Sequence, residues 1–377
     1  MNNVSYETMC FTQLSANDLK DPFLAIKEIF GEDVSAERLQ DECWELITNA
    51  FRPHYWMKGI PPLEFYKIYK KMVRLLEAGW LIYNIRPSYM IKGGIADPFP
   101  HENNAFNASM FNNLGDLNNA YKMLIRLYNN NMLIFYRVDL FEILLQGLNL
   151  ASEQRHYYIG EMVYERYQEI NALIQILYTI VIEGKDNKVT KTDVVVLKGF
   201  ENDFLKRDGC LIYDGDLNNL FDHFIKKADL KEVLKASENV LYQDNYWGCN
   251  SNPGKVIYYF QQYLFILEIF WLYWDKVNAD SEILNLVWDI PTAEAKELRA
   301  VSKEDITKPW KYINDKFTSV PLASWRNNLK EWEEAVLSNK EFKFSKSIDF
   351  KSLQTFLETL IELADLADCF PDLEYID

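Results

Sequence analysis

Two stretches decide the fold: PLEFYKIYKKMVRLLEAGWLIY at residues 62–83 and PGKVIYYFQQYLFILEIFWLYW at residues 253–274. In the first stretch, large apolar side chains recur at intervals of three and four residues, which is the period of an amphipathic helix. Each stretch begins with a proline, which suits a first helical turn because its missing N–H has no partner to lose there. We therefore predict helices at 62–84 and 253–275.

The two stretches also resemble each other residue by residue. Residues 55–83 align with residues 246–274 at an offset of 191 without a gap. The alignment holds seven identities in 29 positions, whereas random pairing would give about two on average residue usage. A second block, 116–148, aligns with 305–337 at the nearly equal offset of 189. Collinear matches at one spacing are hard to produce by chance.

The matched blocks predict an all-α chain that contains a tandem duplication of a helical unit of roughly 190 residues. The first unit would cover 1–190 and the second 191–377. Because two copies are fewer than a solenoid needs, we expect two packed helical domains or one pseudo-symmetric bundle.

The remaining helices are expected from the same apolar period. They lie near 22–31, 35–51, 117–130, 133–149 and 152–182 in the first unit, and near 216–227, 229–242, 306–317, 322–338 and 348–368 in the second. The connector 86–115, with its glycines, prolines and asparagines, is expected to be a loop. The run VVVL at 194–197 is the one plausible strand, with 4–11 as its possible counterpart.

Composition indicates a globular, intracellular protein. Of 377 residues, 49% are hydrophobic and 25% are charged, so the chain can bury two cores. The five cysteines are scattered and none forms a CxxC pair, which argues against a disulfide framework or a cysteine-rich zinc site. The N-terminal residues lack a signal-peptide pattern. We expect a cytoplasmic location, and no cofactor is implied by any motif.

The charge balance favours one kind of partner. The net charge is −16, of which −5 falls on residues 1–190 and −11 on residues 191–377. Excess negative charge disfavours binding to nucleic acid or anionic lipid, so a basic protein is the better partner. A membrane span at 256–274 is not expected, because Gln261, Gln262 and Glu268 interrupt its apolar run. The oligomeric state is left open.

A basic stripe on the helix at 62–84 is a candidate anion site. It consists of Lys67, Lys70, Lys71 and Arg74, and nearby tyrosines could add stacking surface. The alternative is a solvated helix face, which the acidic chain favours. The equivalent positions in the second unit are Tyr258, Gln261, Gln262 and Phe265, so that helix is apolar nearly all round and should be covered on more than one side.

Two carboxylates occupy equivalent positions in apolar surroundings. Glu77 aligns with Glu268, and Arg137 aligns with Arg326. A buried charge is retained only when it is paired, so each glutamate is predicted to be hydrogen-bonded within its own unit, with the arginine as the candidate partner. A pair repeated in both units points to packing more than to a single active site.

Catalytic motifs are weak. Glu153 and His156 form a Glu-x-x-His sequence, which in di-iron proteins supplies two metal ligands, but no second copy exists. The alternative is a charged helix face with pairs such as Arg166 with Glu169. The chain has only four histidines, no phosphate-binding glycine loop and no Arg-x4-6-His ribonuclease spacing. A metal-dependent enzyme with its site between the halves therefore remains an alternative hypothesis.

The leading hypothesis is a non-enzymatic helical protein that binds or regulates another protein. Its more acidic and aromatic second half would supply the contact surface, and aromatic anchors dominate interfaces. The candidate anchors are Trp247, Trp310 and Trp325, and the alternative for each is packing in the core. A nucleic-acid or anion binder that uses the basic stripe is the third hypothesis.

Overall fold

Every regular element in the described part of the chain is a helix. The computed structural model describes residues 13–31, 35–51, 61–85, 117–130, 133–148, 156–184, 253–278, 307–338 and 349–364, and single positions between 189 and 197. The chain divides into two compact units, a first of Val4–Ile212 and a second made mainly of Tyr213–Asp377.

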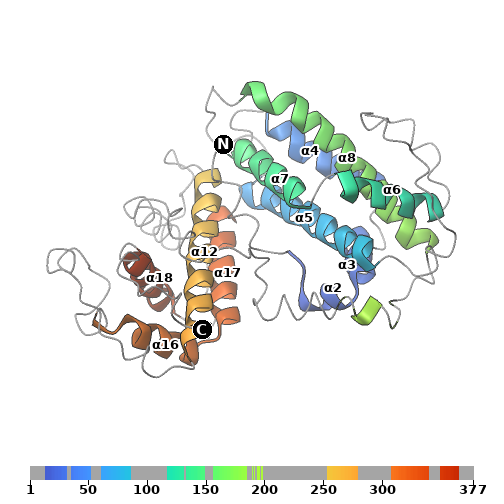
Figure 1. The fold of residues 1–377 in the computed structure, drawn as a ribbon. Coiled ribbons are helices and arrows are strands. Elements are labelled where there is room, and N and C mark those ends of the chain that lie inside the picture. Colours follow the sequence, from blue (N-terminus) through green and yellow to red (C-terminus); the bar gives the residue numbers. More distant parts are fainter. Residues whose placement is uncertain are drawn as a thin grey trace. The chain divides into compact units, whose positions relative to one another are not determined.

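The helices of the first unit pack around one central helix, α5 (Figure 1). α5 contacts each of the six other helices of this unit that the structure describes in full. The seven helices are α2 (Ala16–Lys20), α3 (Pro22–Phe30), α4 (Ala36–Asn49), α5 (Pro62–Ile85), α6 (Leu117–Asn130), α7 (Leu133–Leu148) and α8 (His156–Glu183).

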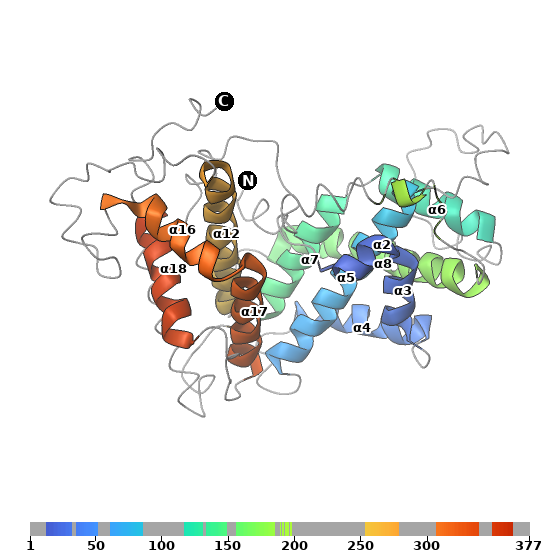
Figure 2. The ribbon, with the colours of Figure 1, turned by 90° about the horizontal axis from the view of Figure 1, so that it is seen from below.

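The described helices of the second unit have a central helix too. They are α12 (Pro253–Val277), α16 (Pro309–Ser319), α17 (Leu322–Ser338) and α18 (Phe350–Ala364). α12 contacts each of the other three, and Figure 2 shows it flanked by α17 and α18. The two stretches that dominate the sequence analysis thus form the central helices of the two units. Along α12, most apolar side chains of Val256 to Phe270 are buried.

Local signals place the helix ends. Asp21 accepts hydrogen bonds from the backbone N–H groups of Phe23 and Leu24 at the start of α3, and Pro22 occupies the first turn. Gly31 ends that helix with φ of 60°, a left-handed conformation in which a residue with a side chain is strained. Ser35 caps α4 through the N–H of Arg38.

The predicted strand at 194–197 is wrong. The described residues of this run, Val194, Val195 and Leu197, are helical, as is Asp193. Asp193 and Leu197 are buried whereas Val194 and Val195 are exposed. Positions four apart share one face of a helix, whereas burial in a strand alternates. β-branched side chains favour strands only where they pack on a sheet, and the described residues form no sheet.

Several predicted elements lie outside the described residues. These are the helices near 216–227 and 229–242, the loop at 86–115 and the strand counterpart at 4–11. No helix among the described residues has the length and apolar character needed to cross a membrane.

Candidate functional site

The basic stripe of α5 faces carboxylates. Lys67 Nζ lies 2.8 Å from Glu64 Oε1 one turn earlier, and Lys71 Nζ lies 2.5 Å from Glu42 Oε2 on α4. Lys70 Nζ lies 4.7 Å from the centre of the Tyr66 ring. The basic side chains of the stripe therefore contact groups of the same unit, on α5 itself and on α4. An incoming phosphate would have to compete with these contacts.

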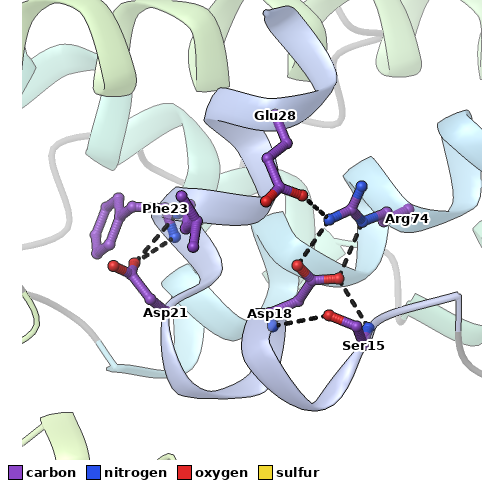
Figure 3. A network of polar contacts seen from close by, with 7 residues as sticks. Ser15, Asp18, Asp21, Phe23, Glu28 and Arg74 are labelled. Carbon is purple, nitrogen blue, oxygen red and sulfur yellow. Dashed lines mark hydrogen bonds and ion pairs between the residues drawn. The ribbon is translucent and has the colours of Figure 1, made fainter.

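Arg74 is the most engaged residue of the stripe (Figure 3). Its guanidinium donates to both carboxylate oxygens of Asp18, at 2.7 and 3.0 Å, and to Glu28 at 2.5 Å. One arginine thus connects α5 to α2 and α3. The Asp18 carboxylate also accepts from the N–H of Ser15, and the Ser15 hydroxyl accepts from the N–H of Asp18, which makes a reciprocal cap for α2.

The electrostatics of this network stabilise both charges. Burial disfavours ionisation of Asp18, but hydrogen bonds from Arg74 and from the Ser15 N–H outweigh this, and the pKa of Asp18 falls below its ordinary value. The hydrogen bond to Asp18 raises the pKa of Arg74. The network is a structural clamp between helices, not a set of groups able to exchange protons near pH 7.

The first unit contains a buried ion pair in its core. Arg137 Nε of α7 lies 3.3 Å from Glu77 Oε1 of α5, and both side chains are almost fully buried. The second Glu77 oxygen accepts a hydrogen bond of 2.7 Å from the backbone N–H of Gln13. The structure therefore brings together the two residues that the sequence analysis offered as partners.

The second unit contains a pair at the aligned positions. Arg326 of α17 donates through Nε and Nη2 to the two carboxylate oxygens of Glu268 on α12. This fork geometry is the one in which arginine binds a carboxylate most strongly. Glu268 is buried. In each unit, then, an arginine from one helix neutralises a glutamate on the central helix.

The candidate tryptophan anchors of the second unit are core residues. Trp310 and Trp325 are buried, and the Trp325 ring packs 4.5 Å from the ring of Phe356 on α18. Trp247 lies outside the described residues. Trp310 and Trp325 therefore follow the alternative, which was packing in the core. A side chain that is inaccessible in the folded unit cannot contact a partner unless the unit opens.

The candidate metal ligands Glu153 and His156 lie at and just before the start of α8. Glu153 lies outside the described residues, as does the side chain of His156 at the start of α8. Among the described residues, no group of three or more histidine, cysteine or acidic side chains could hold a metal ion. Further along α8, Arg166 donates hydrogen bonds to Glu169 of the same helix and to Asp139 of α7. The intrahelical pair offered as the structural alternative is thus present.

The carboxylates around Arg166 are partly buried. Burial raises the pKa of Glu169, and the adjacent Arg166 opposes this increase. The Arg166 guanidinium also stacks on the Tyr136 ring, 5.0 Å from its centre. The guanidinium therefore ties α7 to α8 by charge and by stacking.

Sequence reasoning missed an exposed aromatic cluster on α4 and α8. The rings of Trp44 and Tyr167 lie 4.8 Å apart and are tilted by 58°. Trp44 is 47% exposed, and Tyr164, one turn before Tyr167, is 57% exposed. The available signal was a tryptophan inside an acidic helix, with Asp41 three residues before it.

A cysteine next to this cluster is not a nucleophile. Cys43 is buried, and burial raises the pKa of its thiol to about 12. Only the thiolate is reactive, so the thiol is inert at neutral pH in the folded protein.

The comparisons with known proteins add no relationship. No protein-family model matches the chain, and neither the curated proteins nor the solved structures include a significant match to it.

Proposed function

We propose that this chain is a non-enzymatic helical protein that binds or regulates a basic partner protein. The observation that carries the proposal is that many basic side chains already contact carboxylates within their own unit. Lys67, Lys71, Arg74, Arg137, Arg166 and Arg326 each contact a carboxylate of the same unit. With a net charge of −16, an excess of carboxylates remains to attract positive charge.

We further propose that the two units are copies of one ancestral helical unit. The aligned pairs Glu77–Arg137 and Glu268–Arg326 support this. Aligned ring contacts support it as well: Tyr83 and Tyr128 lie 5.6 Å apart at 38°, and Trp274 and Phe317 lie 5.5 Å apart at 39°. A contact repeated in two copies is better explained by packing than by a single active site.

The nucleic-acid alternative has less support. Three cations of the basic stripe contact carboxylates, so a phosphate backbone would have to displace Glu64, Glu42, Asp18 or Glu28. Displacement would leave Asp18 buried without its counterion, which is costly. The cytoplasmic location stays a prediction that depends on the scattered cysteines.

The proposal is tested by capture from the native host with the full-length chain as bait, in 50 mM and in 500 mM salt. We expect a protein of high pI that is retained at low salt and released at high salt, because screening weakens contacts between exposed charges. The same protein must then bind the purified chain directly. Capture of acidic proteins alone, or binding that is indifferent to salt, would contradict the proposal.

The enzyme alternative is tested on the same preparation. Metal analysis of the purified chain should find no stoichiometric iron, manganese or zinc. One equivalent of any of these metals, lost on substitution of Glu153 or His156, would favour the enzyme.

A further inference from the structure

We propose that Trp44, Tyr164, Tyr167 and Asp41 form a receptor for an arginine side chain from a basic segment of the partner protein. This inference rests on the proposed function and names the surface that would carry it.

The aromatic part of the receptor is built on two packed helices. Trp44 projects from α4 and Tyr167 from α8, and these two helices contact each other. The ring contact of 4.8 Å fixes the indole against the phenol. Tyr164 lies three residues before Tyr167 on α8, so the two phenols share one face of that helix. A rigid aromatic surface loses little conformational entropy when a ligand stacks on it.

Exposure distinguishes this tryptophan from the core indoles. Trp310, Trp325 and Trp332 are buried, whereas Trp44 leaves nearly half of its surface in contact with solvent. Covering the exposed part of this indole with a ligand would remove apolar surface from water, which is favourable. An exposed indole beside an exposed phenol is the type of anchor that interfaces use.

The charge around the cluster selects a cation. The α4 sequence AERLQDECWELITN contains four carboxylates and one arginine, and that arginine, Arg38, has its Nε 3.8 Å from Glu42. Asp41 is exposed and lies three residues before Trp44 on α4, so its carboxylate and the indole share one face of that helix. Glu165, next to Tyr164, is exposed as well.

These features together favour a guanidinium. Arginine stacks flat on an indole or phenol ring and keeps its N–H donors at the edge, where a carboxylate such as Asp41 can accept them. A phosphate or a carboxylate ligand would be repelled by Asp41 and Glu165. An uncharged apolar ligand could cover the rings but would leave these acids without compensation.

The experiment measures binding of a fluorescein-labelled peptide with three arginines separated by glycine and serine, by fluorescence anisotropy in 50 mM salt. The comparison peptide carries citrulline in place of arginine, which keeps the shape and removes the charge. We expect the full-length chain to bind the arginine peptide and to lose most of that binding with citrulline.

The variants locate the site. Trp44→Ala and Tyr164→Ala should each weaken binding by about two- to fivefold, the range of a cation–π contact at an exposed site. Asp41→Asn should weaken it by a smaller factor, and Trp44→Phe should keep part of it. Phe135→Ala removes another exposed ring, 52% exposed on α7, and should leave binding unchanged. Asp315→Asn on α16 is the matched control for charge. Circular dichroism checks that each variant keeps its helices.

The outcomes separate this inference from the proposed function. Equal binding by wild type, Trp44→Ala and Tyr164→Ala would overturn the receptor and leave a basic partner possible at another surface. Equal loss with Phe135→Ala or Asp315→Asn would overturn it too, because the effect would then not be local. A failure of the proposed function would appear instead in the capture experiment, as the absence of a basic partner.

Discussion

The carboxylate of Asp18 has two structural roles. Its carboxylate caps the start of α2 through the N–H of Ser15, and it also binds the guanidinium of Arg74 on α5. Because the side chain is buried, these hydrogen bonds are what keep it ionised. A residue of this kind makes stability depend on pH.

Replacing Asp18 by asparagine should destabilise the first unit by about 1–3 kcal/mol at pH 7, the cost of removing one charged partner from a buried hydrogen bond. The pKa of Asp18 is lowered in the folded protein, so its stabilisation is present above the unfolded pKa of about 3.9 and is lost as the pH falls through the folded value. Urea unfolding of both proteins at pH 7 and pH 3 measures the difference, which should shrink at pH 3.

Asp21→Asn is the matched control for this substitution. Asp21 caps α3 by accepting from two backbone N–H groups, and asparagine caps a helix about as well as aspartate. Its cost should be below about 0.5 kcal/mol. An Asp18→Asn effect that matches the control, or that does not change with pH, would contradict the role given to Arg74.

At the scale of the element, α7 approaches α5 through a glycine. A Cβ atom added at Gly147 would lie 2.7 Å from two ring atoms of Phe65, which is closer than real contacts allow. Phe65 is fully buried, so its ring has little room to retreat. Glycine is a poor helix former, but at position 147 it allows α7 and α5 to pack closely.

Gly147→Ala should lower the melting temperature although alanine is the better helix former. The propensity gain is about 1 kcal/mol, whereas overpacking a core costs about 1–3 kcal/mol. Thermal unfolding followed by circular dichroism measures the balance. Adding Phe65→Leu should recover part of the loss by making room, and a Gly147→Ala variant more stable than wild type would show that the helices are not in close contact here.

Helix positions could be predicted from the sequence because each depends on nearby residues. The apolar period located α5, α12 and α3, and the structure adds the caps at the ends of α3, Asp21 and Gly31. The strand at 194–197 was wrong because a run of valines gives a propensity but not a packing partner. α2 was not predicted, since five residues carry too little periodicity and depend on Asp18 and Arg74 for support.

The role of each aromatic residue could not be predicted in the same way. Trp310 and Trp325 belong to the core and Trp44 to the surface, although all three lie in helices. Burial depends on which helices meet, and that information is spread over distant segments. The partners Glu77 and Arg137 were accessible to sequence reasoning only because the second unit repeats them at Glu268 and Arg326.

At the scale of the molecule, each unit has one central helix held by an arginine from another helix. α5 and α12 contact all other fully described helices of their own units. In both units, the glutamate of the central helix is buried among apolar side chains, and the arginine compensates its charge. We expect such pairs to favour one arrangement of the helices more than they add net stability, because each ion must be desolvated.

The most direct test of this account is a double-mutant cycle at each pair, read by hydrogen exchange of the helices of that unit. The variants are Glu77→Gln with Arg137→Met, and Glu268→Gln with Arg326→Met, singly and together. Each single substitution should lower the opening free energy by about 3–5 kcal/mol, since it leaves a buried charge without its partner.

The double variants should cost clearly less than the sum of the two single ones, in both units, because contacting residues are coupled. The Glu77 and Arg137 variants should increase exchange in α5 and α7, and the Glu268 and Arg326 variants in α12 and α17. Additive costs at both pairs would mean that the charges do not contact each other. Coupling in one unit alone would contradict the proposal that the two units are copies of one ancestral helical unit.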